Sequence, residues 1–260
     1  MHQYLEKAME AAKLAADLQK SRLWGEVAVS FKGAVDLVTE VDRESEALIV
    51  GLLRREWPDH DILAEENAYD SQGSRFRWII DPLDGTTNFA HGFPWFGPSI
   101  ALEMDGEIVV GVVCHVMMDE MFSAVKGEGA FLNGRRLSVS RNAPLLSTVL
   151  ATGFPYDRTS DNENNFGYFV DFHLRVQGVR RAGAAALDLA YVAAGRLDGF
   201  WECKLKPWDV AAGKLLIEEA GGRVTGYGGE AYSVYDHRIL ASNGLIHDEM
   251  AEVLRRGRTD

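Results

Sequence analysis

Apolar residues recur at helical spacing in two stretches near the N-terminus. Residues 3–23 predict an amphipathic helix, because apolar and small residues such as Leu5 and Ala12 recur on one face. Residues 40–57 predict a second amphipathic helix, which ends before Pro58 because the residue before a proline disfavours the helical conformation. The N-terminal part of the chain is therefore expected to supply two helices with one buried face each.

Shorter apolar runs predict β-strands further along the chain. The turn signals Asp105-Gly106 and Asn133-Gly134 separate consecutive runs. The predicted strands are 62–64, 77–80, 97–104, 107–115, 121–126, 129–132 and 148–152. Helical patterns return at 161–173, 184–194 and 209–220. Because strand-rich and helix-rich segments are interleaved, we expect an α/β or α+β fold of stacked layers.

The composition favours a large folded unit. The chain has 260 residues, of which 47% are hydrophobic, and its seven prolines are scattered without a linker-like run. This content is enough for a packed core in one domain or in two closely joined halves. We expect a single domain whose halves cover residues 1–145 and 146–260.

Charge and cysteine content argue against several classes of function. The net charge of −12 argues against a nucleic-acid partner, which would require a basic face. No apolar run approaches the roughly 20 residues of a membrane span, and the N-terminus lacks a secretion signal, so we expect no membrane association. Cys114 and Cys203 lie among apolar neighbours, as expected for buried thiols in a reducing compartment. We therefore expect a cytoplasmic protein.

The chemistry of the chain is concentrated in one motif that follows the apolar run 78–80. Asp81 and Asp84 are separated by Pro82, which stiffens the loop between them, and are followed by Gly85 and Thr86. Two carboxylates at a strand end attract a hard divalent cation, and the backbone N–H groups of the following turn suit an anion. A site that holds a metal ion and an anion together suggests a phosphate ester as ligand. The alternative is a strand followed by a helix that Asp84 or Thr86 caps.

The longer string DPLDGTTNF resembles the signature of the inositol monophosphatase family, the Mg²⁺-dependent, lithium-sensitive phosphatases. Other segments resemble further motifs of that family, in family order: DLVTEVD at 36–42, LAEE at 63–66, GVRRAGAAA at 178–186, PWDVAAG at 207–213 and EAGG at 219–222. The resemblance thus covers most of the chain, from about Lys32 to Gly222.

This resemblance implies a fold and an assembly. It sharpens the layered fold to alternating layers of helix and sheet (αβαβα), like inositol monophosphatase and fructose-1,6-bisphosphatase. The half at 1–145 would bind metal and phosphate, and the half at 146–260 would form the substrate pocket. The resemblance also implies a homodimer and two or three Mg²⁺ ions per subunit.

The resemblance assigns the metal ligands residue by residue. They are Glu65, Asp81, the Leu83 carbonyl, Asp84 and Asp209, which are hard oxygen donors of the kind that Mg²⁺ takes. Two alternatives stay open here. Asp209 lies where a helix N-cap is expected, so it could cap, ligate or do both. Glu66 follows Glu65 and is expected to be exposed or to lie behind the ligands.

The same resemblance implies a catalytic role for Asp42, Thr86 and Glu65. Asp42 and Thr86 would share a water-activating role near the metal that Glu65 helps to bind. From the residues alone, Thr39 and Asp42 form a capping-box-like pair at the start of a helix, which explains Asp42 at least as well. Both roles are compatible, because the first turn of that helix would place a carboxylate near the metals.

Substrate contacts are also assigned by resemblance, to Asp84, Gly85, Thr86, Gly183, Ala184, Ala185, Glu202 and Asp209. The chain departs from the family in two places. Family members often have Ser or Thr at the position of Ala184, and the loop 32–36 is about one residue shorter than in many members. The short loop leaves the number of metal ions open. The pair Arg180-Arg181 is either an anion clamp or a solvated edge, and we favour the edge.

The function implied is a phosphomonoesterase that hydrolyses myo-inositol 1-phosphate, or a similar small polyol phosphate, by a metal-activated water. Histidinol phosphate, fructose 1,6-bisphosphate, NADP and 3′-phosphoadenosine 5′-phosphate are alternative substrates for the same chemistry. A non-catalytic, protein-binding member of the fold is an alternative of another class, which the intact acidic set argues against because unused clustered carboxylates repel one another. A Ca²⁺-stabilised structural domain is disfavoured because no EF-hand spacing occurs.

Overall fold

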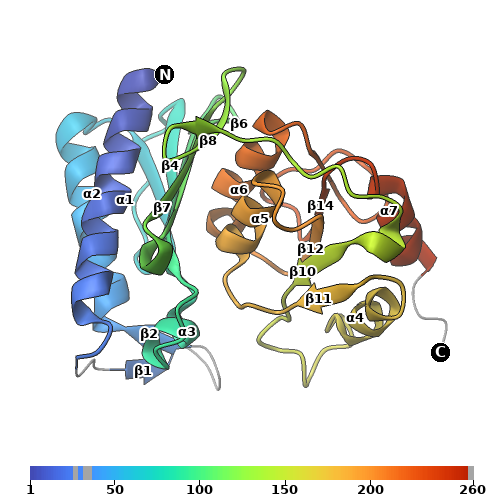
Figure 1. Ribbon diagram of the computed structural model, residues 1–260. Helices are drawn as coiled ribbons and strands as arrows, with labels where there is room; N and C mark the ends of the chain where they lie inside the picture. Colours follow the sequence, from blue (N-terminus) through green and yellow to red (C-terminus); the bar gives the residue numbers. More distant parts are fainter. Residues whose placement is uncertain (26–28, 32–36, 257–260) are drawn as a thin grey trace.

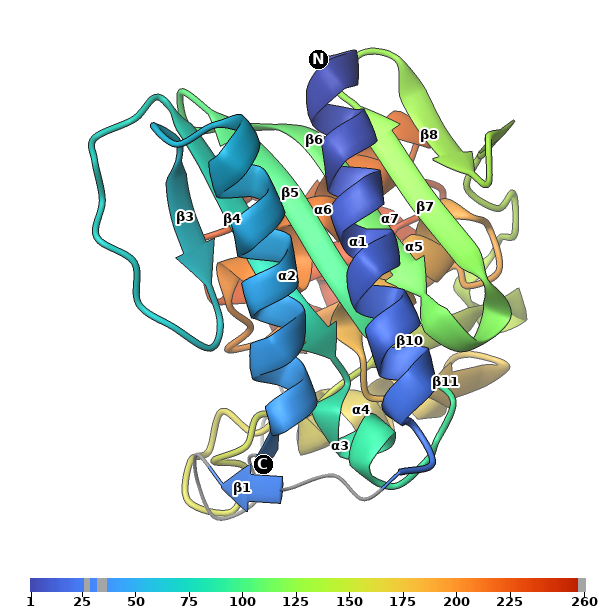
Figure 2. The ribbon, with the colours of Figure 1, turned by 90° about the vertical axis from the view of Figure 1, so that its left-hand side faces the viewer.

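Helices and sheets alternate in five layers in the computed structural model, which describes residues 1–25, 29–31 and 37–256 (Figure 1). The first layer is formed by α1 (His2–Arg22) and α2 (Glu40–Glu56), and it covers a seven-stranded sheet (Figure 2). In spatial order the sheet holds β3 (Asp61–Ala64), β4 (Phe76–Asp84), β5 (Gly97–Met104), β6 (Glu107–His115), β7 (Glu120–Val125), β8 (Gly129–Leu132) and β9 (Arg135–Arg136). Only the β3–β4 pair in this sheet is parallel.

The third layer is formed by α5 (Ala185–Ala193) and α6 (Pro207–Glu219), which contact both sheets. The second sheet has the order β11 (Gly178–Arg180), β10 (Val149–Thr152), β12 (Gly199–Cys203), β14 (Arg238–Ser242) and β13 (Arg223–Thr225). The last layer consists of α4 (Phe166–His173) and α7 (His247–Arg256). The predicted layered fold is therefore confirmed, with α5 and α6 enclosed between two mixed sheets.

Short elements complete the chain. They are β1 (Val29–Phe31), which pairs with β2 (Leu37–Thr39), the helix α3 (Thr86–Ala90), and the 3₁₀ turns η1 (Val116–Met118) and η2 (Leu145–Ser147). The short loop noted at 32–36 lies outside the described residues.

Small residues allow the helices to approach the sheet closely. The buried face of α1 is a stripe of alanines at 8, 11, 12, 15 and 16, whereas Leu5 and Met9 are only partly buried. In the central layer, a Cβ on Gly213 of α6 would lie 2.5 Å from Cβ of Leu189 in α5, and one on Gly111 of β6 would lie 3.0 Å from the Ala212 carbonyl. This close packing fixes where the N-terminus of α6 stands relative to both sheets.

Three predicted boundaries differ from the structure by two residues or more, and the others that were predicted differ by at most one. Strand β4 does not end at residue 80 but continues to Asp84, because pairing with β5 resumes after a shift in register between Asp81 and Asp84. Helix α6 begins at Pro207 rather than 209, since proline suits the first helical position. Helix α4 begins at Phe166 rather than 161, after irregular turns.

Two further expectations concern cysteines and membranes. Cys114 and Cys203 are buried free thiols, as expected, and burial raises the pKa of each to about 12. In the described ranges, no helix combines the length and apolar character that a membrane span requires.

His247 at the start of α7 is an uncharged buried group that ties α7 to the second sheet. It is fully buried, with Nε2 2.8 Å from Thr225 Oγ1 and Nδ1 2.9 Å from Ser242 Oγ. Burial lowers the pKa of His247 to about 4, and the positive charge of Arg223 contributes to this. Its neutral form is thus the one that the fold accommodates.

We expect this histidine to make folding stability depend on pH between about 4 and 6.5. In this pH range His247 is protonated in the unfolded chain but stays neutral in the folded protein. The free energy of unfolding should therefore fall by about 2–3 kcal/mol as pH drops from 7 to 4.5. Above pH 6.5 the group should contribute no pH dependence. Urea unfolding of the protein and of His247→Gln tests this, since the variant should lose that part of the slope. The exposed His91→Gln is the control, and parallel pH profiles for all three proteins would contradict the assignment.

Candidate active site

The two aspartates of the DPLD motif lie buried where β4 ends. Asp81 is 1% exposed and Asp84 is 9% exposed. Asp81 Oδ1 accepts a hydrogen bond of 3.0 Å from the Leu83 N–H, which closes the irregular turn around Pro82. The segment between the acids is therefore not the loop that we expected but a bulged strand end, and its pairing with β5 holds both carboxylates in place.

The second half of the chain comes to this strand end through the segment 182–186. The Ala186 N–H donates to Asp84 Oδ2 at 2.7 Å. Nearby, Asn88 Nδ2 donates to the Ala182 carbonyl at 2.9 Å and to the Trp95 carbonyl at 2.7 Å. The residues predicted to form the substrate pocket at 183–185 thus lie against the turn that follows Asp84.

Thr86 and Asp42 meet as predicted. Thr86 Oγ1 lies 2.7 Å from Asp42 Oδ1 and 3.2 Å from the Leu83 carbonyl. The other oxygen of Asp42 accepts hydrogen bonds from the N–H and the hydroxyl of Thr39, so the capping box at the start of α2 is confirmed. Burial raises the pKa of Asp42, although the bonds from Thr39 and Thr86 act in the opposite direction.

The carboxylates of Glu65 and Asp209, the other two predicted ligands, raise the pKa of Asp81 and Asp84 by electrostatic repulsion. Burial raises the pKa of Asp81 well above its ordinary value. Repulsion from nearby carboxylates raises this pKa further, and these carboxylates belong to Glu65, Asp84 and Asp209. Burial likewise raises the pKa of Asp84, with Asp209 as the next cause. The fold therefore brings acids from the end of β3, from β4 and from α6 close enough for their charges to raise the pKa of Asp81.

Asp209 is not the N-cap that the sequence suggested. It is the third residue of α6, and its Oδ2 accepts a hydrogen bond of 2.6 Å from the N–H of Lys206, the N-cap residue. The carboxylate thus satisfies one of the unpaired N–H groups at the helix start. It is only half-buried, as is Glu65, whereas Asp81 and Asp84 lie deeper.

The donor set suits a hard cation. Within residues 1–25, 29–31 and 37–256, no three histidine, cysteine or acidic side chains already stand close enough to enclose a metal ion. Burial and neighbouring carboxylates nevertheless raise the pKa of both Asp81 and Asp84, so the ionised forms of these two groups are unfavourable without a compensating positive charge. Oxygen ligands of this kind are those that Mg²⁺ binds, so the residues present fit that ion.

Glu202 lies in β12, close enough to the acids for the charge of Asp209 to affect its pKa. Its side chain is buried in β12 against the backbone of Gly153. Burial raises the pKa of Glu202 well above its ordinary value, with Asp209 the next cause, while Arg181 acts to lower it. Arg180 and Arg181 are both exposed, in keeping with the solvated edge that we favoured.

Sequence reasoning missed three buried polar residues that support this region: Gln19, Glu46 and Asp188. Gln19 Nε2 donates to the Pro82 carbonyl at 2.7 Å and to Ser45 Oγ at 3.2 Å. Gln19 and Asp188 each interrupt an otherwise apolar helix face, and this interruption is a signal that the sequence offers. Glu46 shares the buried face of α2 with Asp42 and Ser45. The hydrogen-bond partners of Gln19 and Glu46, however, lie 20 or more positions away in the sequence.

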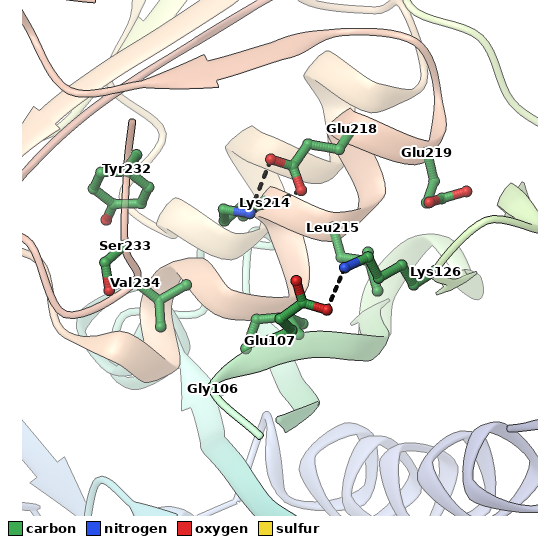
Figure 3. A pocket seen from close by; sticks show the side chains of 11 residues that line it. Gly106, Glu107, Lys126, Lys214, Leu215, Glu218, Glu219, Tyr232, Ser233 and Val234 are labelled. Atoms are coloured by element: carbon green, nitrogen blue, oxygen red, sulfur yellow. Dashed lines mark hydrogen bonds and ion pairs between the residues drawn. The ribbon is translucent and has the colours of Figure 1, made fainter. Parts of the chain in front are cut away.

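A cavity of about 420 Å³ lies elsewhere, beside α6 (Figure 3). Four of its charged side chains form pairs, since Lys126 contacts Glu107 and Lys214 contacts Glu218, whereas Glu219 accepts hydrogen bonds from the Gly127 and Gly129 N–H groups. None of the predicted site residues lines it. It is therefore separate from the acidic site.

The fold and the site define a layered α/β protein with an acidic site to which both halves contribute. A sequence model of the inositol monophosphatase family matches residues 1–258. The chain belongs to the inositol monophosphatase family. The resemblance seen in the DPLDGTTNF string is thereby confirmed over almost the whole chain.

Three relatives show the extent of the similarity. The chain is 47% identical to the inositol-1-monophosphatase of Synechocystis sp., over 96% of this chain and 88% of that protein. It is 45% identical to the Nus factor SuhB of Pseudomonas aeruginosa, over 94% of this chain and 92% of that protein. The structure of inositol monophosphatase from Anabaena (Nostoc) sp. matches with a TM-score of 0.91 and 43% identity, covering 98% of this chain and 96% of that one.

Gly85 is expected to be irreplaceable at the site. Its φ is +92°, and a Cβ would lie 2.8 Å from the backbone oxygen of Trp95. Gly85→Ala should therefore lower the free energy of unfolding by about 3 kcal/mol, combining backbone strain with a backbone clash. Gly73→Ala is the matched control, because Gly73 has φ +72° but open space around it, and it should lose only about 1 kcal/mol. Equal losses in urea unfolding would show that the close approach to Trp95 is unimportant.

Proposed function

We propose that this protein is a Mg²⁺-dependent phosphomonoesterase that hydrolyses myo-inositol 1-phosphate, or a similar small polyol phosphate, to the free polyol and phosphate. The observation that carries this proposal is the gathering of acids from both halves around the Gly85-Thr86 turn. Membership of the inositol monophosphatase family and the name of the Synechocystis relative support it.

The residues that would hold the metal are Glu65, Asp81, Asp84, Asp209 and the Leu83 carbonyl, with two or three ions per subunit. When bound, Mg²⁺ supplies positive charge that acidifies a water molecule and stabilises the phosphate and leaving oxygens. The hydrogen bonds described above hold Asp81 and Asp84 from the backbone, so these carboxylates need little rearrangement on binding.

Thr86 and Asp42 would orient the attacking water. The Thr86 hydroxyl has a single proton, and when it donates this proton to Asp42 Oδ1 its oxygen can only accept. A water molecule would then donate to Thr86 Oγ1, which leaves a lone pair of the water oxygen directed away from Thr86 and free to attack the phosphate. The raised pKa of Asp42 makes this carboxylate the better acceptor for a proton relayed through Thr86.

The substrate would lie between the turn at Asp84 and the second half of the chain. The amides of Gly85 and Thr86 would contact phosphate oxygens, and the backbone at 183–185 would line the polyol. Buried Glu202 would accept hydrogen bonds from hydroxyl groups, which favours a hydroxyl-rich ligand. Histidinol phosphate, fructose 1,6-bisphosphate, NADP and 3′-phosphoadenosine 5′-phosphate remain alternative substrates for the same residues.

The alternative of another class is a non-catalytic, protein-binding role, and the name of the relative Nus factor SuhB is the observation that favours it. We propose catalysis first, because buried carboxylates that repel one another are costly to keep unless they bind a cation.

We further propose a cytoplasmic, lithium-sensitive homodimer whose subdomains cover residues 1–145 and 146–260. Phe93, which precedes Pro94 and Trp95, is 51% exposed, and this apolar exposure supports a subunit interface there.

Removing one metal ligand should abolish most activity. Asp84→Asn is expected to lower Mg²⁺-dependent phosphate release from inositol 1-phosphate by about a hundredfold or more, because metal charge stabilisation is worth several kcal/mol. The control is Asp61→Asn, a change of another buried acid in the neighbouring strand β3. The Asp61 variant should keep turnover within about threefold of the parent. Near-parental turnover of Asp84→Asn at saturating Mg²⁺ would refute the ligand assignment.

The subunit arrangement has a separate test. Sedimentation equilibrium should give twice the chain mass across a wide concentration range, and Phe93→Glu should shift the protein toward the single-chain mass. A single-chain mass for the parent protein at all concentrations would exclude the dimer.

A further inference from the structure

Glu46 is a buried carboxylate on α2 that has no place in the proposed reaction so far. Its side chain is fully buried, and three donors converge on its two oxygens. The Glu66 N–H donates to Oε2 at 2.8 Å, while Asn67 Nδ2 and the Tyr69 hydroxyl donate to Oε1 at 2.7 and 2.9 Å. Glu46 therefore holds the segment 66–69, which follows β3.

The bond from Glu66 is the one that concerns the site. The Glu66 N–H belongs to the peptide unit that directly follows Glu65, so fixing this N–H fixes the orientation of that peptide plane. The backbone angle ψ of Glu65, and with it the direction of the Glu65 side chain, is thereby restricted. Glu65 lies just beyond the end of β3, where sheet pairing no longer provides this restriction.

The rest of the segment is also tied to α2. Burial, together with the hydrogen bond to Glu46, raises the pKa of Tyr69 to about 12, so its hydroxyl remains a donor at neutral pH. The guanidinium of Arg54, two turns beyond Glu46, lies 4.6 Å from the centre of the Tyr69 ring. Asp42, one turn before Glu46, binds Thr86. One face of α2 thus contacts both segments that carry predicted catalytic residues.

We propose that Glu46 is a positioning residue, which holds the Glu65-Glu66 peptide so that the Glu65 carboxylate is directed toward Asp81 and the divalent cation. This inference rests on the proposed function in one respect, namely that Glu65 is a metal ligand. Loss of a residue that orients a ligand typically costs 10–100-fold in metal affinity.

Asp61 provides a matched control, because it binds the same loop from outside it. It is a buried carboxylate at the start of β3, and it accepts hydrogen bonds from the Gln72 N–H at 2.6 Å and the Ser71 hydroxyl at 2.8 Å. It therefore holds the far end of the segment that begins at Glu65. Loss of Asp61 should cost stability without moving Glu65.

The experiment measures Mn²⁺ binding to the metal-free protein by electron paramagnetic resonance, in the parent and in Glu46→Met, Glu46→Gln and Asp61→Leu. We expect the Kd for Mn²⁺ to rise by at least about tenfold in Glu46→Met and to stay within about threefold of the parent in Asp61→Leu. Glu46→Gln should remain near the parent value. Its carbonyl can accept from Glu66, and its NH₂ can donate to a flipped Asn67 amide and to the Tyr69 hydroxyl.

Hydrogen–deuterium exchange of the metal-free variants supplies a readout that needs no metal. Glu46→Met should speed exchange of the Glu66 amide proton. Asp61→Leu should instead speed exchange of the Gln72 amide proton. If folded Glu46→Met binds Mn²⁺ as tightly as the parent, the positioning role is wrong even though the proposed function stands. If Glu65→Gln also binds Mn²⁺ like the parent, the ligand assignment itself fails, and the proposal for Glu46 fails with it.

Discussion

The burial of the Asp81 and Asp84 carboxylates beside further acids is the constraint on which the rest of this structure depends. Burial and neighbouring acids together raise the pKa of both Asp81 and Asp84. Such groups stay together only where the chain holds them. Asp81, Asp84 and Asp209 each accept a hydrogen bond from a backbone N–H group. These N–H groups lie in β4, at the start of α5 and just before α6, respectively. The layered fold brings these N–H groups together, and the acidic site is therefore a product of the first sheet and the central helical layer.

The local features of the fold could be predicted from the sequence, because they depend on local patterns. Strands β5, β6 and β8 have the predicted bounds 97–104, 107–115 and 129–132, since each is an apolar run closed by turn residues. Helix α1 follows from its periodicity. The extension of β4 through Pro82 could not be predicted, because it depends on pairing with β5 after a change of register. The order of strands in the second sheet depends on equally distant contacts.

The candidate site shows the same division. The acids, the Thr86 hydroxyl and Asp42 were predicted from their motifs, and the structure brings Thr86 to Asp42 and Asp84 to the segment at 186. The supporting groups could not be assigned in advance, since Gln19 and Glu46 bind partners 63 and 20 positions away. A polar residue on a buried helix face shows that a partner is needed but does not identify it. Helices α1 and α2 thus act as a support behind the strand ends.

This support gives the first helical layer a role beyond burying the sheet. Gln19 holds the Pro82 carbonyl, Asp42 holds Thr86 and Glu46 holds the peptide after Glu65. Small alanines on α1 permit this because they let the helix lie close to β5 and β6. The strand end at Asp84 and the segment after Glu65 are therefore tied by hydrogen bonds to α1 and α2.

The central claim is that the acids from both halves bind divalent cations at one place. Anomalous diffraction from crystals grown with Mn²⁺ tests it most directly. We predict anomalous peaks in contact with the carboxylates of Asp81, Asp84 and Asp209. Well-ordered crystals with no Mn²⁺ peak at these carboxylates, or with Mn²⁺ only at surface acids, would contradict it.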